Sequence, residues 1–531
     1  MDCAWADEDW KPTAGVFEFL GQWDKPTKGR FKKLKAQLQQ DARNLRDHTC
    51  DPKLWFTRGK TLLSLGYPEL AAGDFERTLI LIDHGLDYSS KYGKSVRLPW
   101  LQNWIRIYRG PAWELKTFTS AEAAHNSLVD PLKKFRKDTY IAYVDALYLN
   151  RAIPDVIQLC KDALKLYPRD RDFLELLEEG EDTFSTHMAD QKENLIIAGI
   201  PPEKYAWGML AIRLYPWTPS DLRTRTAATI ASANQMLLSC SDSLEIRSSS
   251  VGGLGMFAKR DIQKGERILS APSVTGTSNK PSTGRYCYNC AAALKTSSTL
   301  AFSCCPSMKF CGEECKTIAG NNYHNALCGK DFSDIYKSAL SNEFAESTVA
   351  RDTLIFLRLL AMSVQARTHP LATPPIAWIT ANYEAQSPLP WSRGVNIIGP
   401  IKILEKLGVN IFAEEYDTWV MQTMLNRARN NSRTHDSSLR QTVINPMYSF
   451  FNHSCEPDTL DQTELSRNAE QTSRAVMICT KAVKAGTEVF TSYMEPNVLM
   501  LPKAMRHHFM TKGSWFGPEV CRCKRCLAET R

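Results

Sequence analysis

The chain has 531 residues, of which 43% are hydrophobic, 23% charged and 10% aromatic. This length predicts roughly two to four domains, and the composition is close to that of ordinary globular proteins, which excludes disordered, collagen-like and fibrous chains. The formal net charge of +8 is small for so long a chain and argues against a strongly cationic nucleic-acid-binding protein.

The sequence pattern shows no targeting signal. The N-terminus, MDCAWADEDW, has neither the basic nor the apolar region of a signal peptide. The longest apolar run, LIFLRLLAMSV at 354–364, is interrupted by Arg358 and is far shorter than the roughly 20 residues of a membrane helix. We therefore expect an intracellular protein, in the nucleus, the cytoplasm or both, without membrane association. Thiols stay reduced there, so the 16 cysteines are not expected to form a disulfide framework.

Residues 1–240 show helical periodicity throughout. Two stretches resemble each other, LGYPELAAGDFERTLIL at 65–81 and NRAIPDVIQLCKDALKLYP at 150–168. Both place small or apolar residues at helical spacing, and the second closes with Pro168, where a helix would stop. The pattern resembles tetratricopeptide repeats, although an ordinary helical bundle fits two copies about as well. Residues 1–240 are thus predicted to be a helical domain for binding or packing.

The pattern changes at about Leu244. Short apolar runs then alternate with Gly and polar turns, which predicts successive short strands. A cysteine-rich block follows at 287–328, helical spacing returns at about 331–440, and strand-like alternation returns at 474–494. The cysteine block is therefore predicted to be an insertion within one β-rich domain, and the whole chain to be an α+β multidomain protein.

The cysteine-rich block contains seven cysteines and one histidine, enough ligands for two tetrahedral zinc sites. A CxxC turn lets both sulfurs reach one ion. The remaining spacings predict that two of the pairs lie at i, i+4 on one face of a helix. The alternative is a cluster of structural cysteines without metal. The candidate ligands are Cys287, Cys290, Cys304, Cys305, Cys311, Cys315, His324 and Cys328.

This block resembles a MYND zinc finger, in which the ligands of two zinc ions interleave. The resemblance implies that Cys287, Cys290, Cys311 and Cys315 hold one zinc ion. It implies that His324 and Cys328 hold the other together with Cys304 and Cys305. The central pair departs from the usual CxxC, because Phe302 stands where the first cysteine would fall. Cys305 keeps the family's spacing to Cys311, so the second site is expected to be either distorted or three-coordinate.

Three further motifs resemble the SET domain of protein lysine methyltransferases. They are GLGMFAKRDIQKGERIL at 253–269, YSFFNHSCEPDT at 448–459 and AGTEVFTSY at 485–493, in the family's order. The C-terminal CRCKRC resembles a post-SET segment. That resemblance implies a third zinc ion held by Cys521, Cys523, Cys526 and, from the NHSC loop, Cys455. A MYND finger inserted after the first strands is the arrangement of SET and MYND domain proteins.

The resemblance implies the domain bounds and the cofactor. The domains would be 1–240 (helical), 245–497 (SET, split by the insertion), 287–328 (MYND) and 498–531 (post-SET). The cofactor would be S-adenosylmethionine, whose close binding by backbone suits Gly253 and Gly255, since glycine lacks Cβ. The alternative for the two glycines is a plain hairpin turn. The alternative for His453 is a buried histidine with a structural role. The other implied cofactor residues are Asn431, with Asn430 nearly as good a candidate, Asn452 and His453.

Tyr493 matches the family's catalytic tyrosine. An ammonium has no lone pair, so the acceptor lysine must lose its proton. A narrow aromatic channel favours the neutral amine by desolvation, and a tyrosine hydroxyl at its end can position the amine. The alternative role for Tyr493 is packing at a strand end. Trp515 and Phe516 are candidates either for the channel wall or for packing the C-terminal segment, and Asp458 replaces the family's usual Asn without an expected loss of activity.

These motifs together imply a zinc-binding, S-adenosylmethionine-dependent protein lysine methyltransferase acting on a histone or another protein. Partner proteins would bind through the tetratricopeptide-like and MYND modules. The alternative is a non-enzymatic adaptor that uses the SET fold as a scaffold. Retention of both glycines, the Asn-His pair and Tyr493 speaks against that alternative. Sequence-specific DNA binding is disfavoured because the cysteine spacing lacks the long helix-containing loop of C2H2 fingers.

Overall fold

The computed structural model divides into two compact parts. The helical unit comprises Met1–Thr218, Leu389–Ile401 and Asn410–Trp419, and the sheet unit comprises Pro219–Pro388, Lys402–Val409 and Val420–Arg531. The structure describes residues 1, 4–14, 23–87, 89–90, 93, 97, 121–197, 208–278, 284–294, 300–341, 348–383, 385, 389–434, 441–462, 474–512 and 521–529. None of the described helices is long and apolar enough to cross a membrane.

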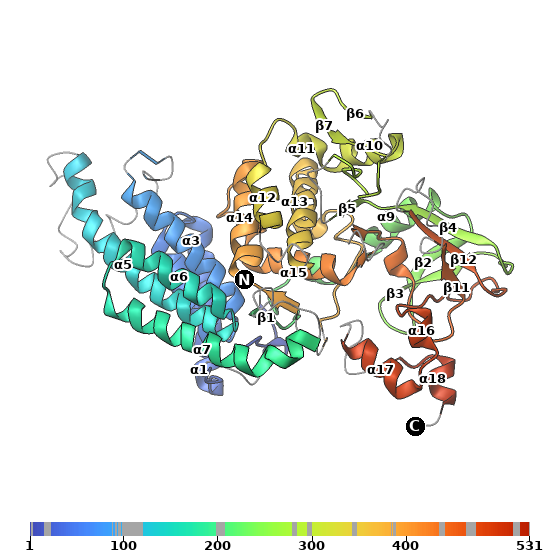
Figure 1. Cartoon of the computed structure of the whole chain (residues 1–531), viewed down its shortest axis with the longest axis horizontal. Helices are drawn as coiled ribbons and strands as arrows, with labels where there is room; N and C mark the ends of the chain where they lie inside the picture. The colour runs from blue at the N-terminus through green and yellow to red at the C-terminus, as the bar shows by residue number, and fades with distance from the viewer. Residues whose placement is uncertain are drawn as a thin grey trace. The chain divides into compact units, whose positions relative to one another are not determined.

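The helical unit confirms the predicted helical N-terminal region. Each helix contacts the next along the chain, α1 with α2, α2 with α3, α3 with α5, α5 with α6 and α6 with α7 (Figure 1, blue to green). Such neighbour-to-neighbour packing is typical of helical repeats, and the tetratricopeptide assignment stays a prediction. The helices are α1 (Lys28–Asp47), α2 (Pro52–Ser64), α3 (Pro68–Leu86), α5 (Ala121–Leu149), α6 (Ile153–Leu166) and α7 (Arg171–Ile197).

Local sequence explains where these helices begin. Asp51 caps α2 by accepting a hydrogen bond from the backbone N–H of Lys53, and Thr27 caps α1 in the same way. Helices α2, α3 and α6 each carry a proline in the first turn, where a missing N–H costs nothing. Helix α6 ends at Leu166, just before the predicted stop at Pro168.

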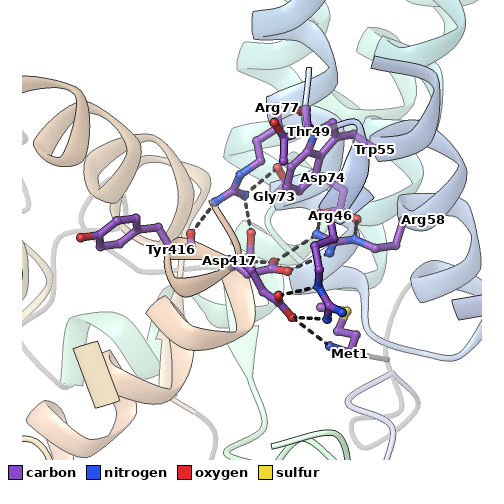
Figure 2. A network of polar contacts seen from close by, with 12 residues as sticks. Met1, Arg46, Thr49, Trp55, Arg58, Gly73, Asp74, Arg77, Tyr416 and Asp417 are labelled. Carbon is purple, nitrogen blue, oxygen red and sulfur yellow. Dashed lines mark hydrogen bonds and ion pairs between the residues drawn. The ribbon is translucent and has the colours of Figure 1, made fainter. Parts of the chain in front are cut away.

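A buried network of charges ties the segment Asn410–Trp419 into the helical unit (Figure 2). The guanidinium of Arg58 pairs with Asp74 at 2.7 Å and with Asp417 at 2.8 Å. Arg77 donates to the hydroxyl of Thr418 at 2.6 Å and to the carbonyl of Tyr416 at 2.8 Å. Removing a buried charge from water is costly unless it is fully paired, so the three helical charges and the late segment with Asp417 stabilise one another.

A second late segment, Leu389–Ile401, also belongs to the helical unit. Strand β1 (Gly208–Leu210) pairs antiparallel with β8 (Leu389–Trp391). Arg393 then bonds to Glu76 at 2.9 Å and to the hydroxyl of Tyr143 at 3.1 Å. The helical unit is thus built from three stretches of chain, of which the last two come long after the first in the sequence.

The sheet unit contains small antiparallel sheets. The pairs are β2 with β3, β11 with β12 and β4, β5 with β10 and β9, and β6 with β7. A continuous core fills the space beneath β2, β3, β4 and β12, which lie together in Figure 1. The strands are β2 (Leu244–Ser248), β3 (Leu254–Ala258), β4 (Arg267–Pro272), β5 (Thr275–Thr277), β6 (Ala301–Phe302), β7 (Cys305–Lys309), β9 (Ser432–Thr434), β10 (Thr442–Ile444), β11 (Thr459–Asp461) and β12 (Arg474–Cys479).

The chain contains further helices and turns. Short single turns also occur at Asp7–Asp9, Gly320–His324, Pro370–Ala372, Gly394–Ile398, Glu414–Tyr416 and Tyr448–Phe450. The helices are α8 (Ser220–Arg223), α9 (Ala227–Leu238), α10 (Glu313–Ala319), α11 (Asn325–Leu327), α12 (Ser333–Ser341), α13 (Thr348–Ala366), α14 (Gly399–Leu407), α15 (Thr418–Asn430), α16 (Pro496–Leu499), α17 (Lys503–Lys512) and α18 (Lys524–Ala528).

The sheet unit begins at Pro219, earlier than the predicted start at 245. The reason is the side chain of Asn234 on α9, which donates to the carbonyl of Ile246 at 3.0 Å and accepts from its N–H at 2.8 Å. This amide thereby pairs the outer edge of β2, which would otherwise expose its backbone groups. Helices α8 and α9 are therefore part of the sheet unit rather than of the helical one.

Candidate active site and metal centres

The hairpin of β2 and β3 places the two candidate cofactor glycines. Gly253 lies in its turn with φ of +63°, a backbone conformation that side chains disfavour. Gly255 lies on β3 opposite Arg247. A Cβ at Gly255 would stand 2.2 Å from Oε1 of Glu488 and 3.1 Å from Nδ2 of Asn452. Glycine is thus required at position 255 so that Glu488 and Asn452 can approach β3 closely, and at position 253 because the turn has a positive φ.

Three side chains, the buried Glu488 and the half-buried Asn452 and Ser249, form a clamp against Gly255, which we call the Glu488 clamp. Asn452 donates through Nδ2 to Oε1 of Glu488 at 2.7 Å and to the carbonyl of Leu254 at 3.1 Å. The hydroxyl of Ser249 lies 2.8 Å from the same carboxylate. Glu488 lies next to β3, because its backbone forms an isolated antiparallel β-bridge with that of Phe257 on β3. The clamp therefore joins all three SET-like motifs, because Asn452 donates both to Glu488 of the third motif and to the carbonyl of Leu254 in the first.

Two chain segments run side by side next to the clamp. His453 and Thr491 form a parallel bridge. The N–H of Ser454 donates to the carbonyl of Thr491 at 2.8 Å, and the N–H of Thr491 donates to the carbonyl of Asn452 at 2.9 Å. The NHSC loop and the segment that carries Tyr493 are consequently fixed to each other by backbone hydrogen bonds.

His453 and Tyr493 meet at the end of these segments. Nδ1 of His453 accepts a hydrogen bond from the backbone N–H of Tyr493 at 3.0 Å, and the two rings lie 5.4 Å apart. Burial lowers the pKa of His453 to about 4, so the ring is neutral at neutral pH and can accept this bond. The structure places His453 as a support for the backbone that carries Tyr493.

The Tyr493 hydroxyl donates to the carbonyl of Phe451 at 2.9 Å. Burial, followed by the nearby Tyr448 and Glu488, raises the pKa of Tyr493 above its usual range. The hydroxyl is therefore protonated at neutral pH, and its oxygen lone pairs can still accept a hydrogen bond from another group. An acceptor that stays protonated can orient an amine without acting as a base.

The structure places Asn431 and Asn430 at the C-terminal end of α15. Nδ2 of Asn431 donates to the carbonyls of Thr380 at 2.6 Å and Arg427 at 2.8 Å. The side-chain oxygen of Asn430 accepts from the N–H of Asn382 at 3.1 Å. Asn431 is thus bonded to the loop around Thr380 rather than to the Glu488 clamp, and its cofactor role stays a prediction.

The first cysteine cluster brings together the four residues predicted for one zinc ion. Sγ of Cys311 lies 3.6 Å from Sγ of Cys290 and 3.6 Å from Sγ of Cys315. Four sulfurs about 2.3 Å from a tetrahedral zinc ion are separated by about 3.8 Å, so the spacing fits this metal. The four members are Cys287, Cys290, Cys311 and Cys315.

The second cluster contains both central cysteines, so its donor set is four rather than three. Nε2 of His324 lies 3.3 Å from Sγ of Cys304, and Sγ of Cys305 lies 3.8 Å from Sγ of Cys328. Phe302, which replaces the usual first cysteine, stacks on the His324 ring at 3.8 Å. The aromatic ring thereby orients the histidine that faces the cluster.

The prediction that two ligand pairs lie on helix faces is wrong. Cys311 precedes α10 and Cys315 lies within it, while Cys328 follows α11. A sulfur at a helix end is free of the fixed helical direction, so it can turn toward a shared centre. Each of these pairs therefore includes a helix terminus.

The third cluster joins the NHSC loop to the C-terminal segment. Sγ of Cys455 lies 3.4 Å from Sγ of Cys526, and Cys521 and Cys523 complete the group. Arg506 on α17, fully buried, donates to Sγ of Cys526 at 3.6 Å, which offsets thiolate charge. Every described cysteine is a free thiol, as expected of metal ligands. Trp515 and Phe516 lie outside the described residues.

Comparisons with known proteins agree with this geometry. Residues 253–494 match the model of the SET domain family. The chain therefore contains a region that is similar to SET domains. It is 31% identical over 87 residues to a SET and MYND domain-containing protein of Dictyostelium discoideum, over 16% of this chain and 22% of that protein. The chain thus matches about a fifth of that relative's length, and the two findings together support a SET protein of the SET and MYND type.

The search of solved structures found the SET domain of LSMT bound to lysine and AdoHcy. That similarity covers 52% of this chain and 55% of that one, with 14% identity and a TM-score of 0.22.

The SET domain also borders a cavity that sequence reasoning missed. A cavity of about 480 Å³ is lined by Gly253 and Leu254 and by three arginines, Arg223, Arg225 and Arg427. Arg223 ends α8 and Arg225 lies between α8 and α9, in a part of the chain that was predicted to lie outside the SET domain. No motif marks them, and the one available signal was the proximity of two arginines in the run LRTRT.

Proposed function

We propose that this SET-domain protein transfers a methyl group from S-adenosylmethionine to the side-chain amine of a lysine in a protein. The observation that carries the proposal is the Glu488 clamp, which joins Gly255 and Asn452 next to the paired His453–Tyr493 segments.

The cofactor would be held by backbone and amide groups. Gly253 lines the adjoining cavity, Gly255 lets Glu488 and Asn452 pack closely against β3, and Asn452 is already oriented by its two hydrogen bonds. When bound, S-adenosylmethionine supplies a methyl group on a cationic sulfonium, which a neutral amine can attack. Glu488 contributes a negative charge next to this region, which favours a cationic group electrostatically.

Tyr493 would position the acceptor amine. Its hydroxyl proton is committed to the carbonyl of Phe451, so the oxygen presents a lone pair in a fixed direction. A lysine amine that donates a hydrogen bond to this oxygen is held in a fixed orientation. Its nitrogen lone pair then remains free to attack the methyl group. Because Tyr493 stays protonated, the proton that lysine must lose goes to solvent rather than to this residue.

The zinc ions would be structural. We infer that the three clusters hold three ions, the first two as a MYND finger within the insertion 287–328 and the third as a post-SET site. The donor sets, four thiolates in two clusters and three thiolates with one imidazole in the other, are those of closed zinc sites. The third ion would tie the C-terminal segment to the loop that carries Asn452 and His453.

A binding measurement and a transfer measurement test the proposal. Calorimetric titration of the zinc-loaded protein with S-adenosylmethionine should show one site per chain. Mass spectrometry should then detect a gain of one or more methyl groups on lysines of histones or of a cell-extract protein library. Folded, zinc-loaded protein that binds no S-adenosylmethionine would refute the enzyme and favour an adaptor.

A further inference from the structure

The cavity beside Gly253 contains a guanidinium group in an unusual position. Nη2 of Arg225 lies 2.7 Å from the place where a Cβ on Gly253 would stand. Arg225 therefore covers the face of the glycine that is predicted to cradle the cofactor. Thr226 and Thr380 line the same cavity, so polar groups surround the guanidinium.

Arg225 has neither a hydrogen bond nor an ion pair with any residue that the structure describes. Its neighbour Arg427 is different, because its guanidinium donates to the carbonyls of Ile376 at 3.3 Å and Leu371 at 3.4 Å. Arg427 thus has a structural role in holding the cavity wall. Arg225 presents five donors to the cavity without such a role.

The electrostatics of the cavity favour an anion. Burial and, second, the charge of Arg427 lower the pKa of Arg225. Asp221, which is exposed, is the one carboxylate among the described residues of the lining. Helix α9, 12 residues long, begins next to the cavity with Thr226 as its cap, and the positive end of its dipole adds to the same field. An anionic group bound here would offset these charges.

We propose that Arg225 binds the carboxylate of the methionine portion of S-adenosylmethionine. This inference rests on the proposed function. A cofactor seated against Gly253 places its groups within reach of Arg225, and the carboxylate is its one anionic group. A guanidinium fork bonds both oxygens of a carboxylate at once, which fixes orientation as well as affinity. The SET domain would then take a cofactor-binding residue from the segment that precedes it.

The test compares two ligands that differ in that carboxylate, S-adenosylmethionine and decarboxylated S-adenosylmethionine. Calorimetry on the full-length, zinc-loaded protein should show that S-adenosylmethionine binds about 10- to 100-fold more tightly, the range for a hydrogen bond to a charged group. In Arg225→Gln the ratio of the two affinities should fall to about one, and the affinity for the decarboxylated ligand should change little. Arg225→Lys, which keeps the charge without the fork, should give an intermediate preference.

Arg247→Gln is the matched control. It removes the same charge from β2, where Arg247 bonds to the carbonyl of Gly486 at 3.1 Å and lies outside the cavity lining, so the preference should persist. If Arg225→Gln does not fold, Gly253→Ala tests the same contact, because its Cβ displaces the guanidinium and should reduce the preference. A preference unchanged in these variants, or absent from the wild type, overturns the inference alone. Wild-type protein that binds neither ligand overturns the proposed function and the inference with it.

Discussion

Gly255→Ala should destabilise the sheet unit and weaken the cofactor site together. Gly255 lies in an extended strand, so alanine causes no backbone strain and the whole effect comes from contacts. The new Cβ would stand 2.2 Å from Oε1 and 2.9 Å from Cδ of Glu488. An ordinary carbon contact is about 3.5 Å, so the carboxylate must move by more than about 1 Å.

The carboxylate cannot move freely. It is held by Asn452 at 2.7 Å and by Ser249 at 2.8 Å, and both bonds would lengthen. Overpacking costs about 1 to 3 kcal/mol, and hydrogen bonds to a charged group contribute about 1.5 to 3 kcal/mol each. Because the bonds would be weakened rather than lost, we expect a decrease of about 2 to 4 kcal/mol in the free energy of unfolding.

Chemical denaturation, together with S-adenosylmethionine titration, measures both effects. Gly312→Ala is the control, because a Cβ there meets nothing within 4 Å; Gly312 is the N-cap of α10, where glycine is preferred to alanine, so the cost should be about 1 kcal/mol. The decisive comparison is Gly255→Ala in a Glu488→Ala background, where the obstructing carboxylate is gone. If alanine at 255 costs as much there as in the wild type, the contact with Glu488 is not the cause and the reasoning fails.

Four further predictions concern the rest of the chain. Tyr493→Phe should lower the rate of methyl transfer by about 10² to 10³ with cofactor affinity nearly unchanged, as for loss of one positioned donor in an active site; equal rates in single-turnover assays would leave Tyr493 a packing residue. Elemental analysis should find three zinc ions per chain, and Cys523→Ser should reduce the number to two; one or none in the wild type would contradict the ligand assignment. Arg58→Ala leaves two buried carboxylates without their partner and should cost about 3 to 5 kcal/mol in thermal unfolding, whereas Arg46→Ala, which breaks an exposed pair, should cost less than about 1 kcal/mol. Burial raises the pKa of Glu69 to about 7, above its value of about 4.3 in an unfolded chain, so folding favours the protonated form; the stability of the wild type relative to Glu69→Gln should be greatest below about pH 4.3 and fall as pH rises through about 7, and a difference that does not vary with pH would assign the effect to another group.

Much of the site follows from local sequence patterns. The spacing in CRCKRC and CYNC places the sulfurs of each motif within one turn of each other. The joining of Cys455 to the C-terminal cysteines followed from family resemblance, since nothing in the spacing alone links residues 66 or more apart. The order of the motifs likewise anticipated that Gly255, Asn452 and Tyr493 belong to one region.

Other features could not be predicted, because they depend on long-range contacts. The helical pattern over 1–240 gave no sign that α9 would pair the edge of β2 through Asn234. Arg225 has no motif, and its importance comes from the approach of Gly253 in space. A charge pattern in a sequence does not predict which group each charge will contact. Arg427 donates to two backbone carbonyls, whereas Arg225 has no such partner among the described residues.

The composition of the helical unit has a consequence for synthesis on the ribosome. Arg58 and its partner Asp417 are separated by 359 residues, which take about 20 to 70 s to translate. During this interval the emerging helices lack strand β8 and the carboxylate of Asp417, and the buried arginines are incompletely neutralised. The first 218 residues therefore leave the ribosome as an unfinished unit that needs protection from aggregation. A fusion protein that carries only residues 1–218 would lack the segments Leu389–Ile401 and Asn410–Trp419, which complete the helical unit.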